Sequence, residues 1–231
     1  MIVPPSEHTP RTPRPGAPAA SRPQLSVTQI EANVAHELNN LLNVVSACGN
    51  RLASSPDVTA AARLDLLALA GRVAHAIIDG RRRGVSLRRW ISVNPTLRHL
   101  EAAVRLLLSP AIDVALELDP GAGTVHLAPG ELDLMILNLV LDARSRLAGS
   151  GRLEIRSAPE VGSDGDTIAI TVADQRREGS PARSVAEGTQ FGLATVGLIT
   201  RDAGGQVELL PGPGGGWEVW IRLPARPSQT S

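Results

Sequence analysis

The residue best suited to chemistry in this sequence is His36, which Glu37 follows directly and Asn40 follows one helical turn later. Apolar residues around them recur at spacings of three and four, which predicts a helix with one apolar stripe. At about 100° per residue, His36 lies about 200° from neighbouring stripe residues, so its imidazole is expected on a polar, solvent-facing side. Beside a carboxylate, such an imidazole can act as a nucleophile through Nε2. The alternative is an ordinary surface histidine.

Composition excludes several other kinds of chemistry. The chain has 231 residues with 23 basic and 23 acidic side chains, and every basic one is Arg. A mechanism that needs a lysine amine is therefore excluded, and the balanced charge favours neither nucleic acid nor an anionic membrane as a partner. The single Cys48 lies in the apolar stripe, so no disulfide framework is possible. No apolar run approaches the roughly 20 residues of a membrane span, and no signal peptide is visible, so we expect a cytoplasmic protein.

Four segments follow one another along the chain. Residues 1–23 hold seven prolines and predict a disordered arm. Residues 24–84 predict two helices joined by a Ser-Pro-Asp turn, an antiparallel hairpin whose uncovered apolar seam favours a homodimer with a four-helix bundle. Residues 90–224 predict a two-layer α/β sandwich, which makes the whole chain α+β. Residues 225–231 are expected to form a disordered tail.

The elements of the sandwich follow from apolar periodicity and turn residues. Strands 151–157 and 167–173 should pair as one hairpin, and strands 206–210 and 217–223 as another. Pro129 is expected in the first turn of the second helix of the sandwich. The remaining elements are strands at 113–118 and 124–127, and helices at 95–108, 129–147 and 192–203.

Five pieces of the sequence, in this order, resemble the core of the sensor histidine kinases, most closely the nitrogen-regulation-like branch. The resemblance spans about residues 26–224 and implies a GHKL-type, or Bergerat, ATPase sandwich after a dimerisation and histidine-phosphotransfer hairpin. The pieces are His36–Leu42 as the H-box, Asn138–Arg144 as the N-box, Val172–Asp174 as the start of the first glycine box, Gly188–Val196 as the second, and Gly204–Gly205 with the closing hairpin.

The resemblance also implies a role for each site residue. His36 would carry a phosphoryl group, Glu37 would act as its base, and Asn40 would position water or the protein partner. The nucleotide side of the site would use five further residues. Asn138 and Asp142 would hold Mg²⁺ against the phosphates of ATP, Asp174 would accept a hydrogen bond from the adenine amino group, and Gly188 and Gly192 would border the phosphate lid.

Several positions depart from the family pattern. Position 142 is Asp where the family has Asn, which adds negative charge beside a triphosphate. Arg176 and Glu178 stand where the family has glycines, which serve positive φ or a close approach of the backbone to a ligand. Gln190 replaces the middle glycine of the second box, and the lid is reduced to about residues 180–187. These departures predict that the fold is kept and nucleotide binding is lost; the alternative is retained ATP binding.

Three functions follow from this resemblance. The first is an ATP-independent histidine phosphotransferase, in which His36 exchanges a phosphoryl group with aspartates of response-regulator receiver domains. The second is a sensorless autophosphorylating kinase that uses Mg-ATP. The third is a non-catalytic pseudokinase scaffold. If His36 is not the phosphorylated residue, His75 on the second helix of the hairpin is the next candidate.

Overall fold

The computed structural model describes residues 88–162, 165–177 and 189–226, together with Ser46, Gly49, Ala68 and Gly71. These last four residues are exposed and helical. The rest of the expected hairpin and the N-terminal arm lie outside the described residues, so their predictions remain predictions.

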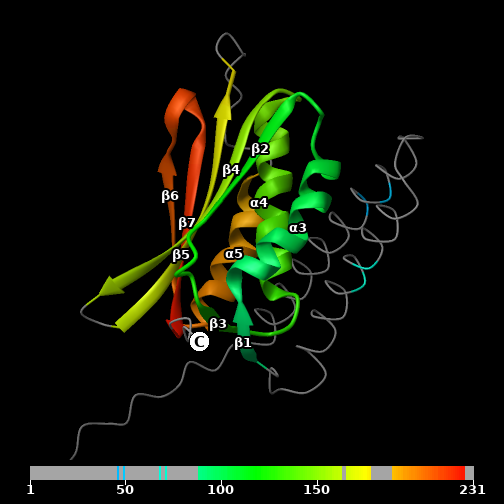
Figure 1. The fold of residues 1–231 in the computed structure, drawn as a ribbon. Coiled ribbons are helices and arrows are strands. Elements are labelled where there is room, and N and C mark those ends of the chain that lie inside the picture. The colour runs from blue at the N-terminus through cyan, green and yellow to red at the C-terminus, as the bar shows by residue number, and fades with distance from the viewer. Residues whose placement is uncertain are drawn as a thin grey trace, which may run out of the picture.

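The described part of the chain begins with a short strand, β1, and ends with a long one, β7. Helices and strands alternate irregularly between them (Figure 1). In chain order the elements are β1 (Arg89–Ser92), α3 (Val93–Leu107), β2 (Ile112–Leu118), β3 (Thr124–Leu127), α4 (Glu131–Leu147), β4 (Gly151–Gly162), β5 (Gly165–Arg176), α5 (Thr189–Asp202), β6 (Gln206–Pro211), the 3-10 helix η1 (Pro213–Gly215) and β7 (Trp217–Arg226).

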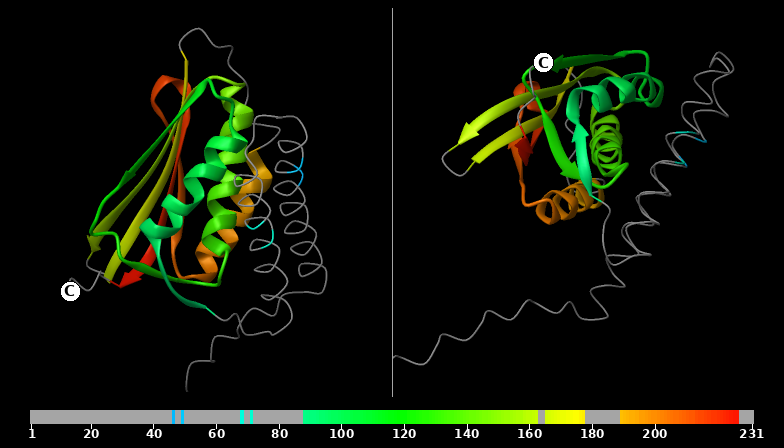
Figure 2. Two further views of the ribbon diagram at one scale, coloured as in Figure 1. Left: turned by 45° about the vertical axis from the view of Figure 1, so that its right-hand side comes forward. Right: turned by 60° about the horizontal axis from the view of Figure 1, so that its bottom comes forward.

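The strands form one mixed sheet in the order β1-β3-β7-β5-β4-β2, and β6 pairs with β7 beside that path. Only the β2–β4 pair is parallel among the described strands; the other pairs are antiparallel. Helices α3, α4 and α5 all lie against one face of this sheet, as both views in Figure 2 show. The result is a layer of helices on a layer of strands.

An aliphatic core fills the space between the two layers. Strand β5 shows why, because Ile168, Ile170 and Val172 alternate along it and are buried, with 3% exposure or less. Helix α4 is buried along most of its length, with Met135, Ile136 and Leu137 fully enclosed. Each fully buried aliphatic side chain contributes roughly 1.5–3 kcal/mol to folding, so this core holds α4 firmly on the sheet.

The helix boundaries follow from local backbone chemistry. Pro95 lies in the first turn of α3, where a missing N–H removes no helical hydrogen bond. Helix α4 begins at Glu131 after Gly130, whose φ is 84°. The expectation that Pro129 lies in the first turn of this helix is therefore wrong, because the chain turns through a left-handed glycine between Pro129 and the helix. The Glu131 carboxylate accepts a hydrogen bond from the Ala128 N–H at 2.8 Å and fixes this entry.

Both expected strand hairpins are confirmed, with longer strands than predicted. The β4–β5 pair runs in unbroken register from Gly151 opposite Arg176 to Gly162 opposite Gly165. The β6–β7 pair runs from Gln206 opposite Arg222 to Pro211 opposite Trp217. Strand β1 was not predicted, and no helix in the described part of the chain is long and apolar enough to cross a membrane.

Candidate functional site

Helix α4 carries three polar side chains at a spacing of four residues: Asn138, Asp142 and Arg146. This spacing places them on one face of the helix, one turn apart. The face lies toward α5 and β5, both of which α4 contacts. The N-box residues that the sequence analysis singled out are thus brought to the same side of the fold as Asp174 of β5.

Asp174 is buried at the centre of this group, and its side chain is only 1% exposed. Its Oδ2 accepts a hydrogen bond from Nε of Arg146 at 2.7 Å and lies 2.5 Å from Nη2 of the same guanidinium. Its Oδ1 accepts from the backbone N–H of Trp217 at 3.2 Å. Both carboxylate oxygens therefore have donors within the protein itself, one of them charged.

Asp142 lies one turn before Arg146, and its Oδ2 is buried without a hydrogen-bond partner among the described residues. Burial raises the pKa of Asp142 from 3.8 to about 6, Arg146 partly opposes this, and the carboxylate of Asp174 adds to it. Gly192 of α5 packs on this side chain, and a Cβ at position 192 would lie 2.6 Å from Oδ2. The absence of a side chain at Gly192 is what leaves room for the carboxylate.

Asn138 is 4% exposed, and its Nδ2 donates to the carbonyl oxygen of Leu134 at 2.9 Å. This bond stays within α4, from one turn to the preceding one. The helix backbone thus uses one of the two N–H groups of the amide, and this bond leaves the amide oxygen, the atom that Mg²⁺ would bind, unused.

The chain beyond Asp174 stays in the sheet. Strand β5 ends at Arg176, whose Nη2 donates to the carbonyl oxygen of Gly215 in η1 at 2.6 Å. Gly216 lies against the carbonyl of Asp174 so closely that a Cβ there would overlap it. Among the described residues outside glycine, only Ala148 has a positive φ, so Arg176 is not forced into a left-handed backbone. Arg176 extends the strand instead.

Four of the eight predicted site residues come together in this region: Asn138, Asp142, Asp174 and Gly192. The other four lie outside the described residues, so the structure does not test their placement. They are His36, Glu37, Asn40 and Gly188.

Sequence reasoning missed Arg146, which contacts Asp174 directly, and Trp217, which binds it through the backbone. The Arg146 contact joins residues 28 apart, from a helix to a strand, and no local pattern encodes such a pairing. One signal was available, because Arg146 continues the spacing of four that begins at Asn138 and Asp142. A long cationic side chain on the ligand-facing side of a helix is a candidate partner for any carboxylate across from it.

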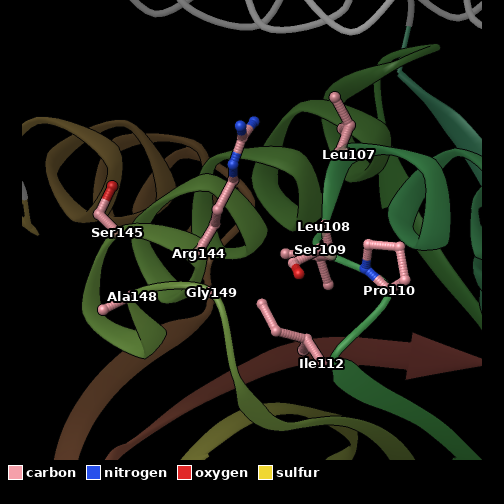
Figure 3. A pocket seen from close by; sticks show the side chains of 9 residues that line it. All are labelled: Leu107, Leu108, Ser109, Pro110, Ile112, Arg144, Ser145, Ala148 and Gly149. Atoms are coloured by element: carbon pink, nitrogen blue, oxygen red, sulfur yellow. The ribbon is translucent and has the colours of Figure 1, made fainter. Parts of the chain in front are cut away.

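Pockets in the described structure lie away from this group. One of about 350 Å³ lies between the C-terminal ends of α3 and α4, lined mainly by Leu107, Pro110, Ile112 and Arg144 (Figure 3). None of the candidate site residues lines it. Within the described ranges, no group of three or more His, Cys, Asp or Glu side chains is arranged to hold a metal ion.

No family model matches this chain, and no curated protein sequence does either. Several solved structures are similar to it. The mycobacterial sensor histidine kinase MprB is 20% identical with a TM-score of 0.49, over 61% of this chain and 99% of that one. A histidine kinase from Burkholderia phymatum STM815 is 16% identical with a TM-score of 0.48, over 83% of this chain and 97% of that one.

A third similar structure is the blue-light activated histidine kinase EL346 of Erythrobacter litoralis. It is 21% identical with a TM-score of 0.46, and the match covers 87% of this chain and 61% of that one.

Proposed function

We propose that this chain works in two-component signalling as an ATP-independent histidine phosphotransferase. In this role His36 receives a phosphoryl group from the aspartyl phosphate of one response-regulator receiver domain and passes it to another. Five motif pieces in the order of the nitrogen-regulation-like kinases support the proposal, together with a mixed sheet covered on one face by three helices. The hairpin would supply both the histidine and the dimer.

The observation that carries the proposal is the course of the chain after Asp174. Where the family pattern has a glycine two residues later, β5 remains a strand through Arg176, and that side chain is bound to Gly215. A glycine at such a position permits a close approach of the backbone to a ligand. Arg176, which is bound to the connection between β6 and β7, occupies the space that such an approach would need. This disfavours a nucleotide beside Asp174.

Asp174, the residue expected to recognise adenine, is already engaged within the protein. One of its carboxylate oxygens accepts from Arg146 and the other from the backbone N–H of Trp217. Of the expected nucleotide contacts, Oδ2 of Asp142 is the one side-chain oxygen in the described site that is buried and without a partner. The proposed transfer therefore involves no nucleotide.

The proposed transfer needs only the hairpin and a receiver domain. The lone pair of His36 Nε2 would attack phosphorus, the bond between phosphorus and the aspartate oxygen would break, and the aspartate would leave as a carboxylate. Glu37 would hold the Nδ1 proton and stabilise the ring as positive charge develops on it. The reverse reaction at a second receiver would return the imidazole to its starting state.

A second candidate is an autophosphorylating kinase that uses Mg-ATP. One observation favours it: the unpartnered carboxylate oxygen of Asp142 is a ligand type that Mg²⁺ accepts. A pseudokinase scaffold, the third possibility, has no observation of its own among the described residues.

The test uses the full chain and a panel of receiver domains labelled on their aspartates with radioactive acetyl phosphate. Without ATP, the wild-type chain should acquire an acid-labile label, and His36→Ala should not. A wild-type chain that accepts no label from any receiver but becomes labelled by Mg-ATP would support the autokinase instead. Label that persists in His36→Ala would move the role to His75.

A further inference from the structure

The ion pair between Arg146 and Asp174 joins the two elements that frame the candidate nucleotide site. Arg146 projects from the last turn of α4, and Asp174 lies near the end of β5. The side chains are 12% and 1% exposed, so the pair is shielded from water. A guanidinium so placed brings two N–H donors, Nε and Nη2, to the same carboxylate oxygen.

The donors of Arg146 have the chemistry that an adenine amino group would offer. By the resemblance, Asp174 accepts a hydrogen bond from that amino group, which is a planar N–H donor on a conjugated ring. The guanidinium is also a planar, conjugated N–H donor, and it carries a full positive charge. Charge-assisted hydrogen bonds are roughly twice as strong as neutral ones. An intramolecular cation therefore holds Asp174 more strongly than a neutral base from solution could.

We propose that Arg146 is a built-in ligand of this site: its guanidinium occupies Asp174 and thereby excludes adenine. This inference rests on the proposed function, because it explains how a kinase-like domain loses its nucleotide while it keeps its fold. The contact between Arg146 and Asp174 supports the inference independently of the substituted glycines, because it occupies the side chain expected to recognise the base.

The neighbouring contacts fit this role. Trp217 N–H holds Oδ1 of Asp174, and Gly216 packs on the Asp174 carbonyl, so the carboxylate has no freedom to turn toward another donor. Asp142 lies one turn from Arg146 and adds a second negative charge beside the guanidinium. Two carboxylates, Asp142 and Asp174, thus favour a cation at this position over a neutral ligand.

A purely structural ion pair would make a different prediction. Removal of one partner from a buried pair leaves an uncompensated charge and lowers stability. If the pair does nothing else, Arg146→Ala is less stable and gains no ligand. If Arg146 is the built-in ligand, the same variant loses stability and also gains affinity for adenine at Asp174.

The decisive measurement is a titration of the full chain with adenosine, followed by NMR. Adenosine carries no phosphates, so the reduced lid does not influence the result, and the two chains that are compared share the same residue at position 176. Wild type should show no saturable binding. Arg146→Ala should bind with an affinity at least about tenfold above any wild-type value, the size of change that one newly available hydrogen bond would produce. Arg146→Ala combined with Asp174→Asn should lose this gain.

Arg144→Ala is the matched control, because Arg144 lies two residues earlier on the same helix and is exposed. It should behave as wild type. If Arg146→Ala fails to fold, Arg146→Met is used in the same titration, since it keeps a long unbranched side chain but carries no N–H donor for Asp174.

Two results would overturn the inference. One is equal adenosine binding by wild type and Arg146→Ala; the other is a folded Arg146 variant without any gain. Neither affects phosphoryl transfer to His36 from a receiver domain. Conversely, a wild-type chain that takes no phosphoryl group while Arg146→Ala gains adenosine would refute the proposed function and leave this inference intact.

Discussion

Gly192 in α5 lies directly against the carboxylate of Asp142 in α4, and a Cβ on Gly192 would come within 2.6 Å of Oδ2 and 3.0 Å of Cγ. By the resemblance noted from the sequence, both residues would border one nucleotide. Here they border each other, so the missing side chain at position 192 serves packing between two helices.

Substitution of Gly192 by Ala should therefore destabilise the fold. The added Cβ must displace the carboxylate or separate the two helices, and overpacking of this kind costs roughly 1–3 kcal/mol. Gly197→Ala is the control in the same helix, because its Cβ would meet Val207 at an ordinary 3.7 Å. That variant should be neutral or more stable by up to about 1 kcal/mol through helix propensity. Urea unfolding of both variants gives the comparison, and equal effects would show that the Asp142 contact is not tight.

Asp142→Asn should stabilise the fold in a pH-dependent way. Burial raises the pKa of Asp142 from 3.8 to about 6, so the folded state binds its proton more tightly than the unfolded state. The stability that this proton provides is fully present below pH 3.8 and is lost as the pH rises toward 6. Above pH 6 the ionised carboxylate costs the wild type about 3 kcal/mol, which the amide avoids.

Urea unfolding of wild type and Asp142→Asn at several pH values measures this effect. The difference in unfolding free energy between them should be small near pH 4, grow up to pH 6 and stay constant above it. A difference that does not change with pH would mean that Asp142 titrates normally in the folded chain.

The strand hairpins and the long helices were predictable because each follows from local pattern. Alternating apolar residues mark β5, and turn glycines mark the β6–β7 hairpin. Strand β1 was not predictable, since its four residues show only an exposed Trp90 and a half-buried Ile91. Strand β1 forms because it pairs with β3, which lies more than 30 residues later in the chain. In this pairing Trp90 lies opposite His126.

Which contacts the candidate site residues make was not predictable from the motifs. The structure brings Asn138, Asp142, Asp174 and Gly192 to one side of α4, and their role as a nucleotide site stays a prediction. The motifs did not show that Asp174 is bound by Arg146, because this pairing depends on how α4 packs on β5 and on the length of one side chain. They also did not show that the chain stays in a regular strand through Arg176. The motifs indicate which residues belong together, and the packing of α4 on β5 decides which contacts those residues make.

Mg-ATP should bind the wild-type chain in the millimolar range or not measurably. Asp174 is engaged by Arg146, and Arg176 stands at a position where the backbone would have to approach the ligand. Isothermal titration calorimetry at neutral pH is the measurement. A dissociation constant in the low micromolar range would show that these contacts open readily and would favour the autokinase.

The full chain should be a dimer at micromolar concentration, because the predicted hairpin at 24–84 has more apolar surface than its two helices can bury. Leu41→Glu places a charge in the apolar stripe and should give a monomer in sedimentation experiments. Asn43→Asp adds a charge on the polar side of the same helix and should leave the dimer intact. A wild-type monomer, or a dimer that survives Leu41→Glu, would contradict this assignment of the interface.

Three substitutions separate phosphotransfer from autophosphorylation. With a labelled receiver domain and no ATP, His36→Ala should abolish the label on the chain. Glu37→Ala should slow its appearance by about 10²–10⁴-fold, the usual effect of losing a general base. Asp174→Asn should leave the rate largely unchanged, because Asp174 lies in the sandwich, where its carboxylate is bound by Arg146 and Trp217, and the proposed transfer takes place at His36. If instead ATP is the phosphoryl donor, His36→Ala and Asp174→Asn should reduce labelling about equally.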